Sequence, residues 1–222
     1  MLEIACFNTS SAVKAADSGA DRIELCADYA WGGITPSLNS LHVIRKDIKI
    51  PINVMIRPRA GNFAYSTSEL EQMKSDIQLF KPVANGFVFG ILNEKNLVDE
   101  EKNRELVELA APLPCTFHRA FDQVPDLLEA TEQVIRCGFT SILTSGAAAD
   151  AVSGAKAVVE LHSKFGSKVT FILGGGVRSI NIESLKRETS IEWYHSAAIT
   201  KPGEDIDREE VQRLQTALKQ VE

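Results

Sequence analysis

The chain has 222 residues, of which 44% are hydrophobic and 24% charged, an ordinary balance for one globular protein with a sizeable core. The formal net charge of −6 argues against a nucleic-acid binder, which would carry a basic face. The start, Met-Leu-Glu-Ile-Ala-Cys, has no basic segment, and no apolar run approaches the roughly 18 residues of a membrane span. We therefore expect a cytoplasmic protein whose four cysteines, none in a Cys-x-x-Cys pair, are reduced thiols.

Short apolar segments recur along the whole chain, and each has the length and the Ile, Val, Leu and Phe content of a buried strand. Longer amphipathic stretches, whose pattern has the period of a helix, separate these segments. The predicted strands are Leu2–Cys6, Arg22–Cys26, Ile52–Arg57, Gly86–Gly90, Cys115–His118, Ser141–Thr144, Val169–Leu173 and Ile191–His195.

A helix is predicted after each strand. Ser66 stands three residues before Glu69, a capping-box spacing that predicts a helix over 66–80. Ser37 follows Pro36 and can cap a helix that continues to Lys46. The others are a helix capped by Ser10 and Ser11 that ends near Asp17, and helices near Asp99–Ala110, Pro125–Cys137, Asp150–Phe165, Ile180–Arg187 and Asp207–Val221.

Eight strands that alternate with eight helices predict a parallel sheet covered by helices. The average unit of about 28 residues is typical of a sheet that closes into a barrel. No Gly-x-Gly-x-x-Gly follows the first strand, which disfavours an open, doubly wound sheet that binds a dinucleotide. We predict an α/β fold, a single (β/α)8 TIM barrel over residues 1–222, with the doubly wound sheet as the alternative.

Polar residues stand where several predicted strands end, and in a barrel this end carries function. Strand alternation turns Glu24 and Arg57 into the barrel. An inward charge is costly unless it is paired, so we expect Glu24 to pair with Arg57, and His118 with Asp122. The alternative is that these inward charged residues have no catalytic role and only stabilise the barrel. The predicted catalytic residues are Glu24, Arg57, His118, Asp122 and His195, with the first three at the centre of the barrel mouth.

Three consecutive glycines follow the seventh strand and precede a short helix. Backbone N–H groups in such a loop can hold an anion, and the loops after strands seven and eight are the usual phosphate site of a barrel. A tight turn that needs glycine is the alternative. A loop at Trp31-Gly32-Gly33 can cover the mouth. The predicted anion-binding residues are Arg59, Ser145, Gly146, Gly174, Gly175, Gly176 and Ser196.

Several motifs together resemble the CutC copper homeostasis protein family. They are Gly-Ala-Asp-Arg-Ile-Glu-Leu-Cys (19–26), Gly-Gly-Ile-Thr-Pro-Ser (32–37), Met-Ile-Arg-Pro-Arg-Ala-Gly-Asn-Phe-Ala-Tyr (55–65), Phe-His-Arg-Ala-Phe-Asp (117–122), Leu-Thr-Ser-Gly (143–146) and Gly-Gly-Gly-Val-Arg with Asn181. They span nearly the whole chain in order. Asn62 stands where members usually have Asp, and Ala197 where a second Ser is expected after Ser196.

The resemblance implies a cytosolic (β/α)8 barrel with a role in copper handling, and it leaves open a homodimer or a higher homo-oligomer. Cys6 and Cys26 are the positions that match the cysteines proposed as copper(I) ligands. Thiolates suit Cu(I). Strand alternation, however, turns Cys6 toward the helices if Glu3 faces inward, so only a bend at the end of the first strand would bring the two thiols together.

Three functions are consistent with these residues. The first is copper homeostasis through copper(I) binding, as the resemblance implies. The second is an enzyme that acts on a small anionic or phosphorylated substrate at the C-terminal face. The sequence offers no inward-facing Lys that would indicate a Schiff base and no strong metal cluster that would indicate a metallohydrolase. The third is a scaffold without catalysis, which would require a blocked mouth.

Overall fold

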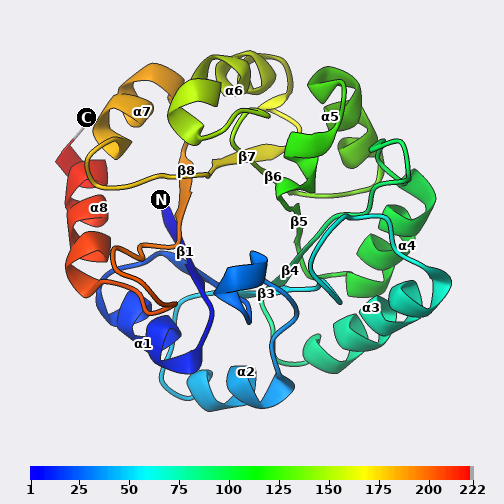
Figure 1. The fold of residues 1–222 in the computed structure, drawn as a ribbon, viewed down its shortest axis with the longest axis horizontal. Helices are drawn as coiled ribbons and strands as arrows, with labels where there is room; N and C mark the ends of the chain where they lie inside the picture. The colour runs from blue at the N-terminus through cyan, green and yellow to red at the C-terminus, as the bar shows by residue number, and fades with distance from the viewer. Residues whose placement is uncertain (221–222) are drawn as a thin grey trace.

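In the computed structural model, which describes residues 1–220, eight parallel strands close into a barrel inside a ring of helices (Figure 1). Each strand pairs with its sequence neighbours, and the last strand pairs with the first. The TIM-barrel prediction is thus confirmed. The strands are β1 Leu2–Cys6, β2 Arg22–Leu25, β3 Ile52–Met55, β4 Gly86–Phe89, β5 Cys115–Phe117, β6 Ser141–Thr144, β7 Thr170–Leu173 and β8 Trp193–Ser196.

Most of the helices begin at a residue whose side chain accepts a backbone N–H of the first turn. The capping box predicted at Ser66 and Glu69 is present, and Ser37 caps the next helix toward the N-terminus. The helices are α1 Thr9–Asp17, α2 Leu38–Ile44, α3 Thr67–Phe80, α4 Glu100–Ala110, α5 Leu127–Arg136, α6 Ala151–Phe165, α7 Ile182–Thr189 and α8 Arg208–Gln220.

Some predicted helix starts differ from the structure, as at Pro125, because α5 begins at Leu127 after its cap at Asp126. Asn8, rather than Ser10 and Ser11, caps α1, because its Oδ1 accepts the N–H of Ser11. α7 begins at Ile182, after a turn that leaves the Ile180 side chain 93% exposed. The predicted end of the last helix, Val221, lies outside the described residues.

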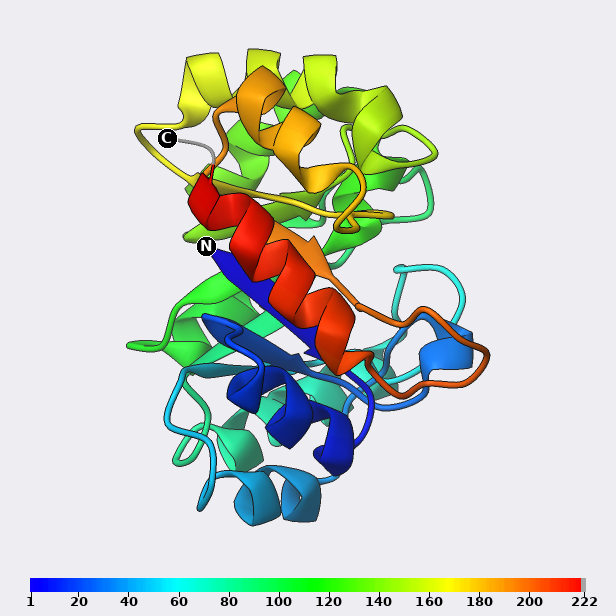
Figure 2. The same ribbon diagram turned by 90° about the vertical axis from the view of Figure 1, so that its left-hand side faces the viewer.

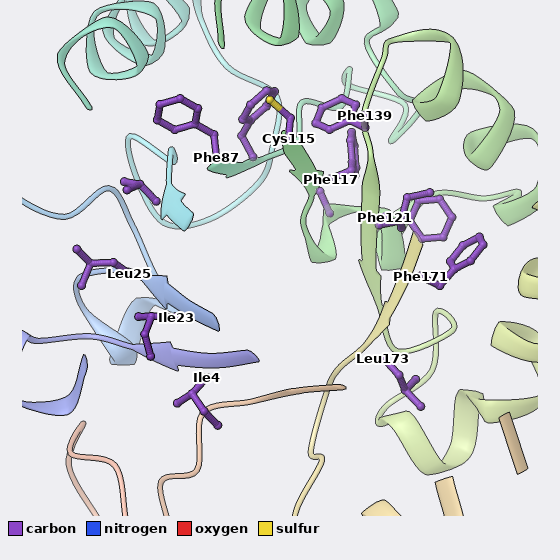
Figure 3. Packing of buried hydrophobic residues seen from close by; sticks show 14 of the residues in the cluster. Ile4, Ile23, Leu25, Phe87, Cys115, Phe117, Phe121, Phe139, Phe171 and Leu173 are labelled. Atoms are coloured by element: carbon purple, nitrogen blue, oxygen red, sulfur yellow. The ribbon is translucent and has the colours of Figure 1, made fainter. Parts of the chain in front are cut away.

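Alternation along the strands separates two packing layers. Side chains such as Ile4, Ile23 and Leu25 face outward and pack beneath the helices, together with phenylalanines of β4, β5 and β7 (Figure 3). The intervening residues face the interior of the barrel, and among them are Glu3 and Glu24. The apolar layer therefore stabilises the barrel and leaves polar side chains inside it.

The loops at the C-terminal strand ends build the functional end of the molecule. A 3-10 helix, Tyr29–Trp31, lies over the barrel opening in Figure 1, as expected for the loop at Trp31-Gly32-Gly33. Figure 2 shows this helix at the same end as the loop that follows β8. Within the described chain, no helix has the length and apolar character needed to cross a membrane.

Candidate functional site

A pocket of about 280 Å³ opens at the C-terminal ends of the strands. Its volume suits a small metabolite rather than a drug-sized ligand. An open pocket here contradicts the scaffold with a blocked mouth. Side chains and loops from most of the strands line the pocket: Ala5, Phe7, Glu24, Cys26, Tyr29, Gly32, Met55, Arg57, Phe63, His118, Arg119, Leu143, Gly175, Gly176, Arg178, His195, Ser196 and Ala197.

A buried network of charged side chains reaches the pocket through two of its members, Glu24 and His195, which line it. Arg22, Glu3 and His195 are neighbours in strand register, on β2, β1 and β8. Arg22 Nε lies 2.5 Å from Glu3 Oε2, and His195 Nδ1 lies 2.8 Å from Glu3 Oε1. His195 Nε2 lies 3.6 Å from Glu24 Oε2 in the pocket wall. Glu3 therefore holds the imidazole so that its other nitrogen faces Glu24.

Burial and neighbouring charges set the protonation of this network. Burial favours the neutral form of Glu3, but Arg22 and His195 outweigh it and lower the Glu3 pKa to about 2. Burial raises the Glu24 pKa to about 6, against a partial opposing effect of His195. Burial also opposes the charged form of His195, but Glu24 and Glu3 together raise its pKa. Two groups with raised pKa values, Glu24 and His195, thus stand side by side at the pocket, and perturbed pKa values are common in catalytic sites.

The ligand atoms of Glu3, Glu24 and His195 lie within 4.8 Å of one another, close enough to surround a cation. However, both oxygens of Glu3 are already engaged, by Arg22 and by His195. The Arg22 guanidinium is itself held over the Trp193 ring at 3.9 Å. A cation would compete with this fixed positive charge, so the group fits a hydrogen-bond network better than a metal site.

The predicted Glu24–Arg57 ion pair was wrong, although both side chains line the pocket. The Arg57 guanidinium donates to the carbonyls of Trp31, Gly33 and Gly61 at 2.8–3.1 Å. Because these loop carbonyls accept the hydrogen bonds of the guanidinium, Arg57 does not pair with the Glu24 carboxylate. Arg57 thus holds the loop that carries the 3-10 helix, and its buried Nε has no partner in the described part of the chain.

The predicted His118–Asp122 pair was also wrong. His118 Nδ1 accepts the N–H of Ala120 at 3.3 Å, which fixes the ring at the end of β5. Burial and the nearby Arg57 lower the His118 pKa to about 3. The ring packs edge to face on Phe63, with ring centroids 4.7 Å apart, and the Arg57 guanidinium lies 5.0 Å from the same Phe63 centroid.

Asp122 instead organises the loop after β6. Its carboxylate accepts Thr144 Oγ1 at 2.5 Å, the N–H groups of Ser145 and Ala147, and the Ser145 hydroxyl. Arg119 Nε completes the set at 2.7 Å. Asp122, Ser145 and Gly146 are therefore brought together behind the pocket wall, while Arg119, which the sequence prediction missed, reaches the pocket.

The glycine loop lies at the pocket as predicted. Gly175 and Gly176 line it with positive φ angles of 99° and 73°, whereas Gly174 sits beneath them and donates its N–H to Thr144. Among the described residues, none accepts the N–H groups of Gly175 and Gly176. Arg178, a second missed residue, lines the same corner and donates to Ser196 Oγ at 3.1 Å.

Arg59 does not line the pocket. It binds Glu69 at 2.5 Å and the carbonyls of Asn62 and Ala64, so it braces the loop before α3. Asn62 contributes only its carbonyl to Arg59, so the departure from the family pattern at this position does not remove that contact.

The two candidate copper ligands have different surroundings. Cys6 packs in the layer between strands and helices, with its thiol 3.6 Å from the Ile4 carbonyl. Cys26 lines the pocket beside Met55, and its thiol donates to Glu24 Oε2 at 3.6 Å. Burial raises the pKa of both thiols, which disfavours the thiolate form. Strand parity predicted these different surroundings, although the two residues are neighbours, with the Cys26 N–H donating to the Cys6 carbonyl at 2.8 Å.

Fold and site together define a TIM-barrel protein with a small polar pocket at the C-terminal mouth. The family model of the CutC family matches residues 1–200. The chain is 40% identical over 199 residues to the human copper homeostasis protein cutC homolog, covering 89% of this chain and 73% of that protein. It is 35% identical over 230 residues to a CutC family protein of Xanthomonas campestris, covering 97% and 96% of the two chains.

The crystal structure of the putative copper homeostasis protein CutC from Streptococcus agalactiae superposes with a TM-score of 0.84 at 30% identity. The match covers 89% of this chain and 98% of that one. The chain therefore belongs to the CutC family and is a homologue of the copper homeostasis protein of that name.

Proposed function

We propose that the pocket binds a small anionic metabolite, with a phosphate or carboxylate group at the glycine loop, and that the protein is an enzyme acting on it. The observation that carries the proposal is a loop that lines the pocket, in which the N–H groups of Gly175 and Gly176 have no acceptor among the described residues. Oriented backbone N–H groups of this kind form anion-binding concavities.

The charges around the pocket agree with an anionic ligand. Arg57, Arg119 and Arg178 line it, against the single carboxylate of Glu24. An arginine can hold a phosphate or carboxylate through two parallel hydrogen bonds. The same charges oppose the entry of a free cation. A volume of about 280 Å³ restricts the ligand to a small metabolite.

Copper(I) is the second candidate ligand, because the chain belongs to a family whose members are named for copper homeostasis. Cys26 and Met55 pack together and both line the pocket, so two soft sulfur donors stand at one place. Cys6, the other proposed ligand, would have to leave the layer beneath the helices. We therefore expect Cys26 to contribute more to Cu(I) affinity than Cys6.

Thermal unfolding distinguishes the two candidates. We expect inorganic phosphate and 2-phosphoglycolate at millimolar concentration to raise the Tm of the reduced protein, since a ligand that binds only the folded state stabilises it. Potassium chloride at matched ionic strength is the control. A Tm that rises with Cu(I) alone would favour the copper role and remove the anionic ligand.

A further inference from the structure

Two pocket residues have complementary unused hydrogen-bonding capacity. His118 Nε2 and Glu24 Oε1 are buried and have no hydrogen-bond partner within residues 1–220, and both side chains line the pocket. An unpaired buried polar atom is energetically costly, so such atoms are rare unless a ligand or water completes their hydrogen bonds. Whether each of these atoms donates or accepts a hydrogen bond follows from the contacts of the other polar atom in the same side chain.

His118 presents a hydrogen-bond donor. Its Nδ1 accepts the N–H of Ala120, so Nδ1 carries no proton and the hydrogen of the neutral ring resides on Nε2. Desolvation and Arg57 both disfavour a second proton on this ring. His118 therefore offers a fixed N–H to an acceptor oxygen and is a poor proton carrier.

Glu24 presents an acceptor. Its Oε2 already accepts the Cys26 thiol at 3.6 Å and faces His195 Nε2 at 3.6 Å, whereas Oε1 has no contact of this kind. The contact between Glu3 and His195 fixes the imidazole below it. The second oxygen thus belongs to a carboxylate that is held through Oε2, and it is itself buried without a hydrogen-bond partner among the described residues.

We propose that the pocket takes a small phosphorylated α-hydroxy carbonyl compound, whose carbonyl oxygen accepts His118 Nε2–H and whose adjacent C–H faces Glu24 Oε1. This inference rests on the proposed function, because the phosphate would lie at Gly175 and Gly176. In this orientation Glu24 is the base and His118 the neutral donor of a reversible enolisation, and Glu3 is a positioning residue for His195.

The step balances within the ligand and the protein. The C–H bond next to the carbonyl breaks, and its proton forms an O–H bond with Glu24 Oε1. The electron pair of that bond becomes the C=C bond of an enediolate, and the carbonyl pair moves onto oxygen, where the His118 N–H stabilises the negative charge. Return of the proton from Glu24 to carbon closes the cycle without a further reactant.

The test compares two probes by calorimetric titration: inorganic phosphate and phosphoglycolohydroxamate, which has a phosphate and imitates an enediolate. We expect the hydroxamate to bind roughly tenfold tighter than phosphate, as hydrogen bonds to a charged group allow. His118→Leu and Glu24→Gln should each remove most of this advantage without weakening phosphate binding. His118→Gln, which retains an N–H donor, should restore part of it.

Two further measurements complete the test, and the first needs only the wild-type protein. The ¹⁵N spectrum of the wild-type protein should show His118 as a neutral ring protonated on Nε2 between about pH 5 and 8. In D₂O, dihydroxyacetone phosphate should gain deuterium at its hydroxymethyl carbon with the wild type and not with Glu24→Gln purified identically. Phosphate binding without a hydroxamate advantage, or His118 protonated on Nδ1, would overturn the enolisation and leave the anion site intact. Failure of both probes to bind would overturn both.

Discussion

Glu3 Oε1 lies 2.8 Å from His195 Nδ1, a contact that joins the first strand of the barrel to the last across 192 positions of sequence. The two residues are partners in the register of β1 and β8, so closure of the barrel creates the contact. Through the imidazole it reaches Glu24 in the pocket wall. Barrel closure and the chemistry of the pocket therefore depend on the same side chains.

The substitution Glu3→Gln tests how much this contact contributes to the stability of the fold. Removal of one partner leaves the Arg22 charge buried without compensation, and this costs about 3–5 kcal/mol of unfolding free energy. The His195 pKa, raised by both carboxylates, should also fall. Urea denaturation and NMR titration measure the two effects. The control Glu183→Gln removes an exposed partner of Arg187 at 3.9 Å and should change stability by about 1 kcal/mol or less. Equal effects of the two variants would contradict this role for Glu3.

The pH dependence of stability has a predictable contribution from Glu24. Its pKa is about 6 in the folded protein and 4.5 as a free side chain, so the folded state binds the proton more tightly. Stability from this group is therefore present below about pH 4.5 and falls by about 2 kcal/mol as the pH rises to 6 and above. Glu24→Gln should remove this decline in denaturation curves recorded across that range. A wild-type slope that persists unchanged in the variant would exclude Glu24 as its origin.

Gly175→Ala should impair the anion site. The new Cβ would lie 3.0 Å from Ser145 Cβ and 3.3 Å from Arg119 Cζ, at a φ of +99° that side chains rarely adopt. Gly203→Ala is a matched control, because its φ is +118° and nothing lies within 4 Å of the new Cβ. Both should lose about 1 kcal/mol or more of stability from backbone strain. Only Gly175→Ala should weaken phosphate binding in a titration, and similar losses in both variants would argue against the loop as the site.

The four cysteines should differ in their contribution to Cu(I) affinity. Under reducing conditions we expect Cys26→Ser to weaken Cu(I) binding and Cys6→Ser to have little effect, because only the Cys26 thiol lines the pocket. Cys115→Ser and Cys137→Ser change buried thiols that do not line it and serve as controls. Competition with a chromogenic Cu(I) chelator measures the affinity. An equal loss in Cys6→Ser and Cys26→Ser would instead support a site that uses both.

Most of the barrel could be predicted because each strand and helix is indicated by the residues of its own segment. Apolar runs of strand length alternate with capped amphipathic helices, as at Ser66 and Glu69, and strand parity correctly turned Glu24, Arg57 and Cys26 inward. The partner of each inward charge could not be predicted in this way. It depends on barrel register, which places Glu3 beside Arg22 and His195, and on loop conformation, which surrounds Arg57 with carbonyls.

The missed residues had weak signals of their own. Arg119 directly follows His118, and Arg178 ends the glycine motif, but nothing in a sequence shows that both side chains turn toward one corner of the pocket. In the sequence, Glu3 indicates only which face of the first strand Cys6 occupies. A buried acid in the first strand of a predicted barrel was the available sign that it needs a partner.

The affinity for 2-phosphoglycolate, measured by calorimetric titration of wild type, Arg178→Gln and Arg187→Gln, tests the central claim most directly. Arg178 lines the pocket beside the glycine loop, whereas Arg187 carries the same charge on the exposed surface of α7. We predict binding to the wild type and to Arg187→Gln with closely similar Kd values, and a loss of roughly tenfold or more in Arg178→Gln, as expected when a charged hydrogen bond is removed. No binding to the wild type, or equal weakening in both variants, would contradict an anion site at the mouth of this barrel.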